Sequence, residues 1–414
     1  MEVAKSVEQR SVGAEIWMLA WGMLAIAAGL GYGRFAFAVL VPAMKRALGY
    51  GSSEIGWLGT SNLVGYTLGA ATAGHAARLA GRKRATVAAL LGVSATAALM
   101  GATTAYPVQI GLRLLGGVGS AWVLVLATSL VLSQAPPWRA GVFLGVLYAG
   151  GGLGIISSGL LLPPLTGLPG GWRLAWVALG ALTAAVGVGY GAFVRPAEAG
   201  ARPPPAESTS GRSGAAGRGV WSRTLANPSL LAVFAAYGLF GFGYIATSTF
   251  FVAYLRDDQG LSKATASLAW TLVGVGGLPG PLLFGRLRDA WGSRRSLVFA
   301  HVVLAASILL PTASASVPAA LIGGLCFGAT FVGLVTVVMA FVGELSPPGD
   351  VAHVIGGATV AASIGQVAGP AVAGMMADAT GTLTSAFVLS ALACLAGAPL
   401  VLLARRRPAA RTVD

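Results

Sequence analysis

The stretch Gly31-Tyr32-Gly33-Arg34-Phe35 lies inside an apolar run that extends from Ile16 to about Val41. A run of this length can cross a bilayer as a helix, so Arg34 is predicted to be a charged side chain at membrane depth. Insertion scales put the cost of an arginine at the centre of such a helix at roughly 2.5–3.5 kcal/mol. Arginines in this position normally face a bundle interior or a water-filled cavity, which makes Arg34 the first candidate for a functional residue.

The alternative is that the Arg34 side chain snorkels to the membrane surface or holds a neighbouring helix. Arg34 lies about seven residues before the predicted end of its helix, or about 10 Å at 1.5 Å per residue, which an arginine can nearly span. The same face of the helix carries the small residues Ala27, Gly31 and Ala38, which would leave room around a guanidinium. We therefore favour the cavity.

The composition is that of a membrane protein with many crossings. Of 414 residues, 56% are hydrophobic and 10% are charged, whereas soluble domains contain about 25% charged residues. Much of the net charge of +14 lies in predicted loops and tails on one side, as the positive-inside rule describes. A nucleic-acid partner would need a basic soluble domain, and the sequence has none. The basic clusters are Arg78–Arg84, Arg195–Arg223, Arg286–Arg295 and Arg405–Arg411.

The chain contains about twelve apolar runs, six on each side of one long connection. The one long connection, residues 195–226, is rich in Pro, Gly, Ser and Arg, which is typical of a flexible linker. We predict an all-α membrane protein with twelve transmembrane helices in two pseudo-symmetric six-helix bundles, residues 16–194 and 227–404. The tails 1–15 and 405–414 and the linker should be cytoplasmic. The runs lie near 16–41, 54–76, 84–105, 107–133, 140–163, 173–194, 229–254, 264–285, 295–312, 318–342, 352–376 and 385–404.

The two halves resemble each other in sequence. Gly29-Leu30-Gly31-Tyr32 recurs as Gly241-Phe242-Gly243-Tyr244, and Gly56-Trp57 has a counterpart in Ala269-Trp270. Matches that recur in order at a nearly constant offset indicate a six-helix repeat. Transporters built from such repeats bind their substrate near the membrane midplane, where the repeats meet.

The loop after the eighth run, Gly285-Arg286-Leu287-Arg288-Asp289-Ala290-Trp291-Gly292-Ser293-Arg294-Arg295, resembles the G-x-L-x-D-x-x-G-R/x-R signature of the major facilitator superfamily. The resemblance implies a gate in which Asp289 closes the cytoplasmic end of a helix, where basic neighbours can pair with it, and Arg294 belongs to the same motif. Gly285 is expected to permit close packing and Gly292 a tight turn. The alternative is an ordinary basic loop that fixes the topology.

The first half carries a defective copy of this signature. Gly74, Gly81 and Arg82 match it, but Arg78 stands where the family has aspartate, so we assign no gating carboxylate there. In the eleventh run, Gly365 and Gly369-Pro370 resemble the glycine-proline motif that antiporter-type members carry in helix five. Glycine spacings of this kind are common in membrane helices, and they indicate antiport only weakly.

Within the superfamily, three segments resemble the bacterial YbfB/YjiJ-type group. They are Gly33-Arg34-Phe35, Pro42-Ala43-Met44 and the series Gly56-Trp57, Asn62, Gly65-Tyr66 and Gly69. The resemblance covers nearly the whole chain apart from the termini and the linker. It implies the twelve-helix fold, a transport function and a place in the bacterial inner membrane, and it does not name a substrate.

A second arginine is predicted at a depth similar to that of Arg34. Arg113 lies about six residues into the fourth run. The fourth run begins on the periplasmic side of the membrane, which is the side where the first run ends. No acidic residue falls in the middle of a run, and Glu54 is the one acid that could reach Arg113. A buried unpaired cation is costly, and an anionic ligand would relieve that cost. The alternative is that Arg113 is structural, tied to helix-end carbonyls or to Glu54.

Polar residues at helical spacing could complete a substrate site. Each could instead be a hydrogen bond between helices, which is worth about 0.6 kcal/mol on average. Those on the seventh run form one stripe with Gly241 and are the best of the set. The candidates are Asn62, Tyr66, Tyr148, Tyr237, Tyr244, Ser248 and Gln366.

We predict a secondary active transporter of a small organic solute, an organic anion such as a carboxylate, that works by rocker-switch alternating access. The alternatives are an exporter of hydrophobic compounds or drugs, and a receptor on the same fold that binds without transport. The sequence shows no nucleotide-binding loop, metal-ligand cluster or catalytic triad, so we expect no enzyme activity, cofactor or metal. The expected partners are the anionic substrate, lipid and a coupling proton or counter-substrate, with the protein a monomer.

Overall fold

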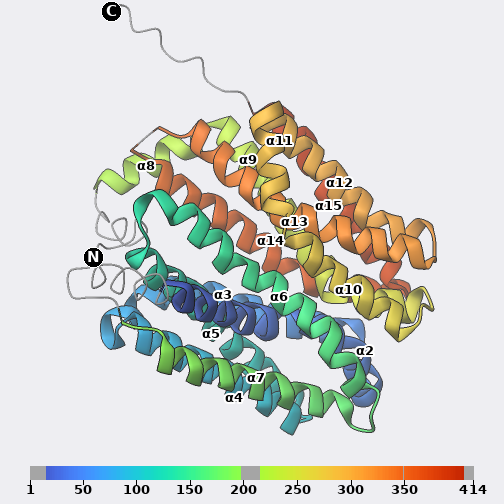
Figure 1. Cartoon of the computed structure of the whole chain (residues 1–414). Helices are drawn as coiled ribbons and strands as arrows, with labels where there is room; N and C mark the ends of the chain where they lie inside the picture. Colours follow the sequence, from blue (N-terminus) through green and yellow to red (C-terminus); the bar gives the residue numbers. More distant parts are fainter. Residues whose placement is uncertain (1–14, 197–214, 348, 405–414) are drawn as a thin grey trace, which may run out of the picture.

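The computed structural model describes residues 15–196, 215–347 and 349–404, and these are almost entirely helical (Figure 1). Ten helices are long and apolar enough to cross a membrane, and the pair α10 and α11, bent by 48°, makes an eleventh crossing. The 29-residue helix α3 is less apolar, but by length and order it is the twelfth. The predicted apolar runs are therefore confirmed as helices, in the predicted order.

The first half consists of a helix from Glu15 to Leu48, then α3 (Ser52–Ala80), α4 (Arg82–Ala102), α5 (Tyr106–Gln134), the short η2 (Pro137–Arg139), α6 (Ala140–Thr166) and α7 (Gly171–Phe193). The second half consists of α8 (Ala215–Leu225), α9 (Pro228–Ala253) with η3 (Tyr254–Asp258), α10 (Lys263–Gly277), α11 (Gly280–Trp291), α12 (Ser293–Ala313), α13 (Val317–Leu345), α14 (Val351–Thr380) and α15 (Leu383–Leu403). Figure 1 shows the blue-to-green first half packed along the yellow-to-red second half.

The first helix is longer than predicted, and this decides how Arg34 is placed. It contains a π-helical segment, η1 (Ala27–Phe35), and continues as α2 (Phe37–Leu48) rather than ending near residue 41. Arg34 is therefore about 14 residues, or about 21 Å, from the end of α2 at 1.5 Å per residue. An arginine side chain cannot span that distance, so Arg34 does not snorkel to that end of the helix.

The predicted flexible linker, 195–226, is wrong in its second part. Residues 215–225 form α8, and Arg223 makes an ion pair of 2.9 Å with Asp350 at the start of α14. The Trp221 ring lies against Gly357 of α14, where it would block a larger side chain. Helix α8 is therefore anchored to the second half. Residues 197–214 and most of the two predicted tails, 1–14 and 405–414, lie outside the described residues.

The signature glycines behave as predicted at the turns and not elsewhere. Gly81 and Gly292 occupy equivalent turns in the two halves with φ of 78° and 80°, values that side chains with a Cβ rarely adopt. In contrast, a Cβ on Gly285 would meet no atom within 4 Å, so the predicted close packing at Gly285 is wrong. Gly74 is similarly open, with only the Arg78 side chain 3.9 Å from such a Cβ.

The two halves meet closely at the end of the molecule opposite the basic loops, which we call the outer end. There the Asp378 carboxylate of α14 accepts hydrogen bonds from the backbone N–H groups of Ser52, at 2.8 Å, and Ser53, at 2.7 Å. These are the first residues of α3, whose exposed N–H groups and dipole favour a negative charge. Backbone contact of Gly374 with Ser52, and of Gly56 with Pro370, brings α3 and α14 together. The outer end is therefore closed.

We predict that Asp378→Asn opens the outer end, because it removes the charge that holds α3 of the first half to α14 of the second. A charge at a helix terminus contributes about 0.3–1 kcal/mol, so the outward-open population should rise about two- to fivefold. Labelling of a Thr249→Cys variant, lacking Cys326 and Cys394, with a membrane-impermeant maleimide from outside measures that population.

Asp258→Asn is the matched control. The Asp258 carboxylate also caps a helix, accepting from Thr382 Oγ1 and Leu383 N at 2.6 Å, but both partners lie in its own half. Its loss should lower stability and leave labelling unchanged. Equal labelling of the two variants and the wild type would show that Asp378 does not hold the halves together.

Candidate functional site

The π-helical segment η1 places Arg34 at the seam between the two halves. Its wider turn is marked by the hydrogen bond from Ala36 N to Gly31 O, 2.8 Å long and five residues apart. On one side, Gly31 touches the backbone of Gly154 in α6 so closely that neither residue could carry a Cβ. On the other side, Arg34 points toward α9 and α14. Two glycines in contact thus hold the segment against α6 and leave its charged face toward the second half.

Arg34 is buried, with 8% of its surface exposed, and all its partners are neutral. One Nη atom donates to the Tyr244 hydroxyl at 3.0 Å and to Gln366 Oε1 at 2.7 Å. The guanidinium carbon lies 5.2 Å from the ring centres of both Phe35 and Tyr66, which is a weakly favourable cation–π distance. Arg34 Nε is buried without a hydrogen-bond partner. The site therefore has a cation with unused donor capacity.

Arg113 is buried too, but its surroundings satisfy it. Its Nε donates to Leu58 O at 3.2 Å and its Nη1 donates to Gly33 O at 3.1 Å, while its guanidinium lies 4.4 Å from the Phe37 ring centre. These bonds fit the structural alternative for Arg113. Of the two partners that this alternative allowed, Arg113 uses carbonyls and not Glu54, whose carboxylate lies by Gly51 and Asp378 at the outer end. In the described residues, no carboxylate lies within 4.0 Å of either arginine.

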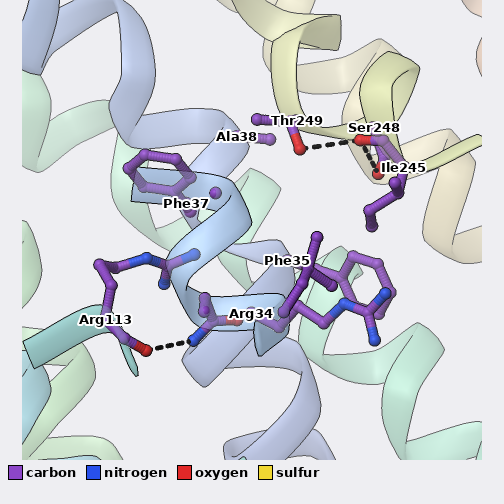
Figure 2. Close-up of a pocket in the computed structure, with 11 residues that line it drawn as sticks. Arg34, Phe35, Phe37, Ala38, Arg113, Ile245, Ser248 and Thr249 are labelled. Carbon is purple, nitrogen blue, oxygen red and sulfur yellow. Dashed lines mark hydrogen bonds between the residues drawn. The ribbon is translucent and has the colours of Figure 1, made fainter. Parts of the chain in front are cut away.

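A small cavity lies between the two arginines and is lined from both halves (Figure 2). It holds about one water molecule, so the site is nearly filled in this closed arrangement. Figure 2 shows the Arg113 guanidinium beside the Phe37 ring, with Ser248 and Thr249 facing the cavity from α9. The lining residues are Arg34, Phe35, Phe37, Ala38, Gly59, Asn62, Leu63, Arg113, Ile245, Ser248 and Thr249.

The structure brings together some of the predicted site residues and separates others. Tyr66, Tyr244 and Gln366 meet at Arg34. Ser248 lines the cavity, but its hydroxyl donates to Ile245 O at 3.1 Å. Tyr148 is 52% exposed and is not among the residues that bond to Arg34 or line the cavity.

Asn62 connects helices while keeping one atom free. Its Nδ2 donates to Arg113 O at 3.0 Å and to Gly33 O at 3.4 Å, and so joins three helices. Its Oδ1 is buried with no partner. Sequence reasoning did not include Phe35, Phe37 and Thr249, although Phe35 and Phe37 flank Arg34 on its own helix and Thr249 follows the chosen Ser248.

Tyr237 does not touch either arginine but begins a column of stacked rings. The ring centres of Tyr237 and Phe240 are 5.5 Å apart, those of Phe240 and Tyr244 are 4.7 Å apart, and those of Tyr244 and Phe331 are 5.4 Å apart. The planes differ by at most 18°. The column passes Arg34 at Tyr244 and ends at Phe331, which approaches Phe35 at 6.3 Å. An apolar surface thus leads to the buried charge.

The predicted gating residues lie away from this site. Asp289 is 68% exposed and pairs with its neighbour Arg288 at 2.8 Å. Arg294 donates to the Leu402 carbonyl, so the basic neighbour that pairs with Asp289 in this state is Arg288. Arg82 opens α4 directly after the Gly81 turn.

The glycine-proline motif of α14 serves helix packing. Gly365 touches Gly238 O, and a Cβ on Gly369 would lie 2.6 Å from Phe242 O, so both residues let α9 approach. Pro370 touches α3 at Gly56. The motif therefore joins α14 to both α9 and α3, and it places Gln366 on α14 within reach of Arg34.

Residues 26–402 match the sequence family described as "Uncharacterised MFS-type transporter YbfB". The chain belongs to the major facilitator superfamily. This superfamily member is 27% identical to the chloramphenicol resistance protein of Streptomyces lividans over 278 residues, which is 64% of this chain and 66% of that protein. It is 24% identical to the hexuronate transporter of Bacillus subtilis (strain 168) over 383 residues, which is 86% of this chain and 87% of that protein.

Solved transporter structures share the fold of this superfamily member. The inward-facing, unoccupied bacterial homolog of the human lysosomal transporter Spinster has a TM-score of 0.73 at 17% identity, over 94% of this chain and 95% of that chain. The nucleoside transporter NupG has a TM-score of 0.75 at 14% identity, over 94% and 98% of the two chains. These likenesses confirm the predicted twelve-helix fold. The family match confirms the resemblance to the YbfB-type group and the prediction of a membrane transporter.

We predict that Arg113→Leu lowers the stability of this transporter. It removes the two hydrogen bonds that the guanidinium donates to the buried carbonyls of Gly33 and Leu58, each worth about 1.5–3 kcal/mol for a charged donor, offset in part because a buried charge is removed. The melting temperature in detergent should fall. The folded fraction should keep its ligand affinity within about threefold, which corresponds to a change in binding free energy of only about 0.6 kcal/mol. An unchanged melting temperature with lost affinity would instead make Arg113 a ligand-binding group.

Proposed function

We propose that this protein is a secondary active transporter of a small organic anion, and that Arg34 binds the carboxylate of that anion. The observation that carries the proposal is the charge of Arg34, which is buried at the seam and has only neutral partners. A buried cation without a counter-ion is unfavourable, and a bound anion removes that cost. The planar guanidinium matches a carboxylate with two parallel hydrogen bonds, and Arg34 Nε is unused.

The partners of Arg34 come from both halves, which supports alternating access. Arg34 belongs to the first half, whereas Tyr244 and Gln366 belong to α9 and α14 of the second. An anion that replaces the Gln366 oxygen on Arg34 changes the bonds between the halves at the point where they meet. Ligand binding and rigid-body rocking of the halves are then energetically linked, as two-state transport requires.

The surroundings of Arg34 also suit the uncharged part of the ligand. The column of rings from Tyr237 to Phe331, together with Tyr66 and Phe35, offers flat apolar surfaces next to the guanidinium. The similarity to a hexuronate transporter supports an anionic substrate. We therefore favour a carboxylate attached to a compact body that can lie against aromatic rings.

A second candidate function is the export of hydrophobic compounds or drugs. The same column of rings and the similarity to a chloramphenicol resistance protein favour it. It gives no role to the uncompensated charge of Arg34, which is why we rank it second. A receptor that binds without transport is a third candidate, and tracer exchange in proteoliposomes distinguishes it from both transporters.

We predict that Arg34→Ala abolishes binding of the small carboxylate that stabilises the wild type most. The affinity should fall at least about 30-fold, because charge-assisted hydrogen bonds of about 1.5–3 kcal/mol each are lost. Arg34→Lys should restore part of it, since an ammonium supplies the charge without the planar fork. Melting temperature and affinity are measured on the same preparations. A destabilised Arg34→Ala protein with wild-type affinity would make Arg34 a structural tie.

Substitutions of Gln366 should act in opposite directions. Gln366→Glu places a carboxylate where the Arg34 acceptor now lies, 2.7 Å away, so it should neutralise Arg34 and abolish anion binding without lowering the melting temperature. Gln366→Met removes the acceptor, leaves the cation less satisfied, and should keep or tighten anion binding. Calorimetric titration measures both. Normal anion affinity in Gln366→Glu would contradict competition at Arg34.

A further inference from the structure

A second basic pocket lies at the outer end of the seam, and it is part of neither the cavity at Arg34 nor the signature loops. We call it the outer vestibule. It is formed by α2 and the end of α6 from the first half, and by α9, η3 and α10 from the second. Its lining contains three cations, Arg46, Arg256 and Lys263, together with the hydroxyls of Thr166 and Ser267.

The positive charge of the outer vestibule is only partly compensated. Arg46 pairs with Asp257 at 3.5 Å, but both side chains are partly exposed, at 57% and 32%, and such a pair is weak. The carboxylate of Asp258 is occupied by Thr382 and Leu383 at 2.6 Å. In the part of the chain that the structure describes, no carboxylate lies within 4.0 Å of Arg256 or Lys263. The pocket therefore has a surplus of cations.

These cations are unusual for their side of the membrane. Membrane proteins concentrate Lys and Arg in cytoplasmic loops, and the two basic clusters that the structure describes throughout, Arg78–Arg84 and Arg286–Arg295, lie at the other end. Three cations gathered around one pocket at the outer end therefore run against the topological bias. Topology does not explain them, and a function in that pocket does.

The outer vestibule lies on the same two helices as the cavity at Arg34. On α2, Val39 and Arg46 line the vestibule while Phe37 and Ala38 line the cavity. On α9, Val252 lines the vestibule and Thr249 lines the cavity. Arg46 follows Arg34 by twelve residues, about 18 Å along the helix. The vestibule therefore lies beyond the cavity at Arg34 along the same two helices.

We propose that the outer vestibule is a binding site for small organic anions. The carboxylate of the anion binds between Arg256 and Lys263 on the way to or from Arg34. This inference rests on the proposed function for the direction of travel, but the binding itself does not require it. Converging cations at the mouth of a narrow path raise the local concentration of anions, and the effect weakens as salt increases. In this state the pocket itself holds about one water molecule, but Arg46, Arg256 and Lys263 are not buried, so solvent reaches the cations while the seam below them is closed.

The test measures the charge of the vestibule directly. In a variant that lacks Cys326 and Cys394, Thr166→Cys or Ala43→Cys places a thiol in the lining. The thiol is reacted with an anionic sulfonatoethyl and with a cationic trimethylammonium-ethyl methanethiosulfonate, and each rate is divided by the rate for free cysteine. We expect the anionic reagent to be favoured at least about tenfold at low salt. Arg256→Gln together with Lys263→Gln should remove the preference.

Arg173→Gln is the control for the loss of positive charge elsewhere, and it removes one charge where the double variant removes two. Arg173 lies in the first turn of α7, and its guanidinium donates to Gly101 O at 2.9 Å within the first half. It lines none of the vestibule. Its substitution should leave the preference for the anionic reagent unchanged. Equal loss in the control and in the double variant would mean that overall charge, rather than the vestibule, attracts the reagent, and would overturn the proposal.

Protection by a ligand tests the binding step. Glucuronate should slow labelling at Thr166→Cys, whereas glucose, a neutral sugar of similar size, should not. Protection should persist in Arg34→Ala and disappear in the Arg256 and Lys263 double variant. If protection persists but no anion binds at Arg34, the vestibule is still an anion site and the proposed function is wrong. No protection in the wild type, or no reaction at either cysteine, would overturn the vestibule.

Discussion

The buried charge of Arg34 is the constraint on which the rest of this site depends. A guanidinium in the middle of a membrane protein loses its hydration, and the protein must supply polar groups in place of water. It supplies the Tyr244 hydroxyl and the Gln366 carbonyl from the second half, and two aromatic faces. None of these groups carries a negative charge. The two halves are thus joined at midplane through a cation that is solvated but not neutralised.

The two arginines of the site are held in different ways, and one irregularity of the backbone serves both. The π-helical segment η1 presents Arg34 to the second half, and the carbonyl of Gly33, next to it, accepts from Arg113 and Asn62. Arg113 thereby ties α5 to the first helix and to Leu58 of α3. Arg113 thus supports the segment that carries Arg34. A polar network that holds a reactive group in place is what a binding site needs from its surroundings.

Sequence patterns predicted the features of this protein that are local. Apolar runs gave the order of the helices, and the turns at Gly81 and Gly292 could be predicted because only glycine tolerates their positive φ. Arg34 could be singled out because a charge in an apolar run is rare. The length of its helix could not, since α2 continues past residue 41 through Pro42 and the basic pair Lys45-Arg46. Helix α8 was missed because contacts with α14 hold it.

The choice among polar candidates depended on contacts between distant segments. Tyr237 and Tyr244 share a stripe of α9, yet it is Tyr244, together with Gln366 of α14, that accepts a hydrogen bond from Arg34. Asn62 and Arg113 looked like ligand groups, and both bind backbone carbonyls that the sequence does not mark. Gly285 matched a signature but packs against nothing. Spacing along a helix identifies a face, whereas the partner of each side chain is set by helices that are remote in sequence.

We propose that this transporter prefers an anion, and the melting temperature of the purified wild-type protein is a direct measure of that preference. The protein is heated with small carboxylates, phosphates, amino acids, cations and neutral apolar compounds, each over a range of concentrations. A ligand that binds the folded state stabilises it by mass action, by about 2.7 kcal/mol at a hundred times its Kd. We predict that one or more carboxylates raise the melting temperature in a saturable way. A rise with cations or neutral compounds, and with no anion, would show that the substrate is not an anion.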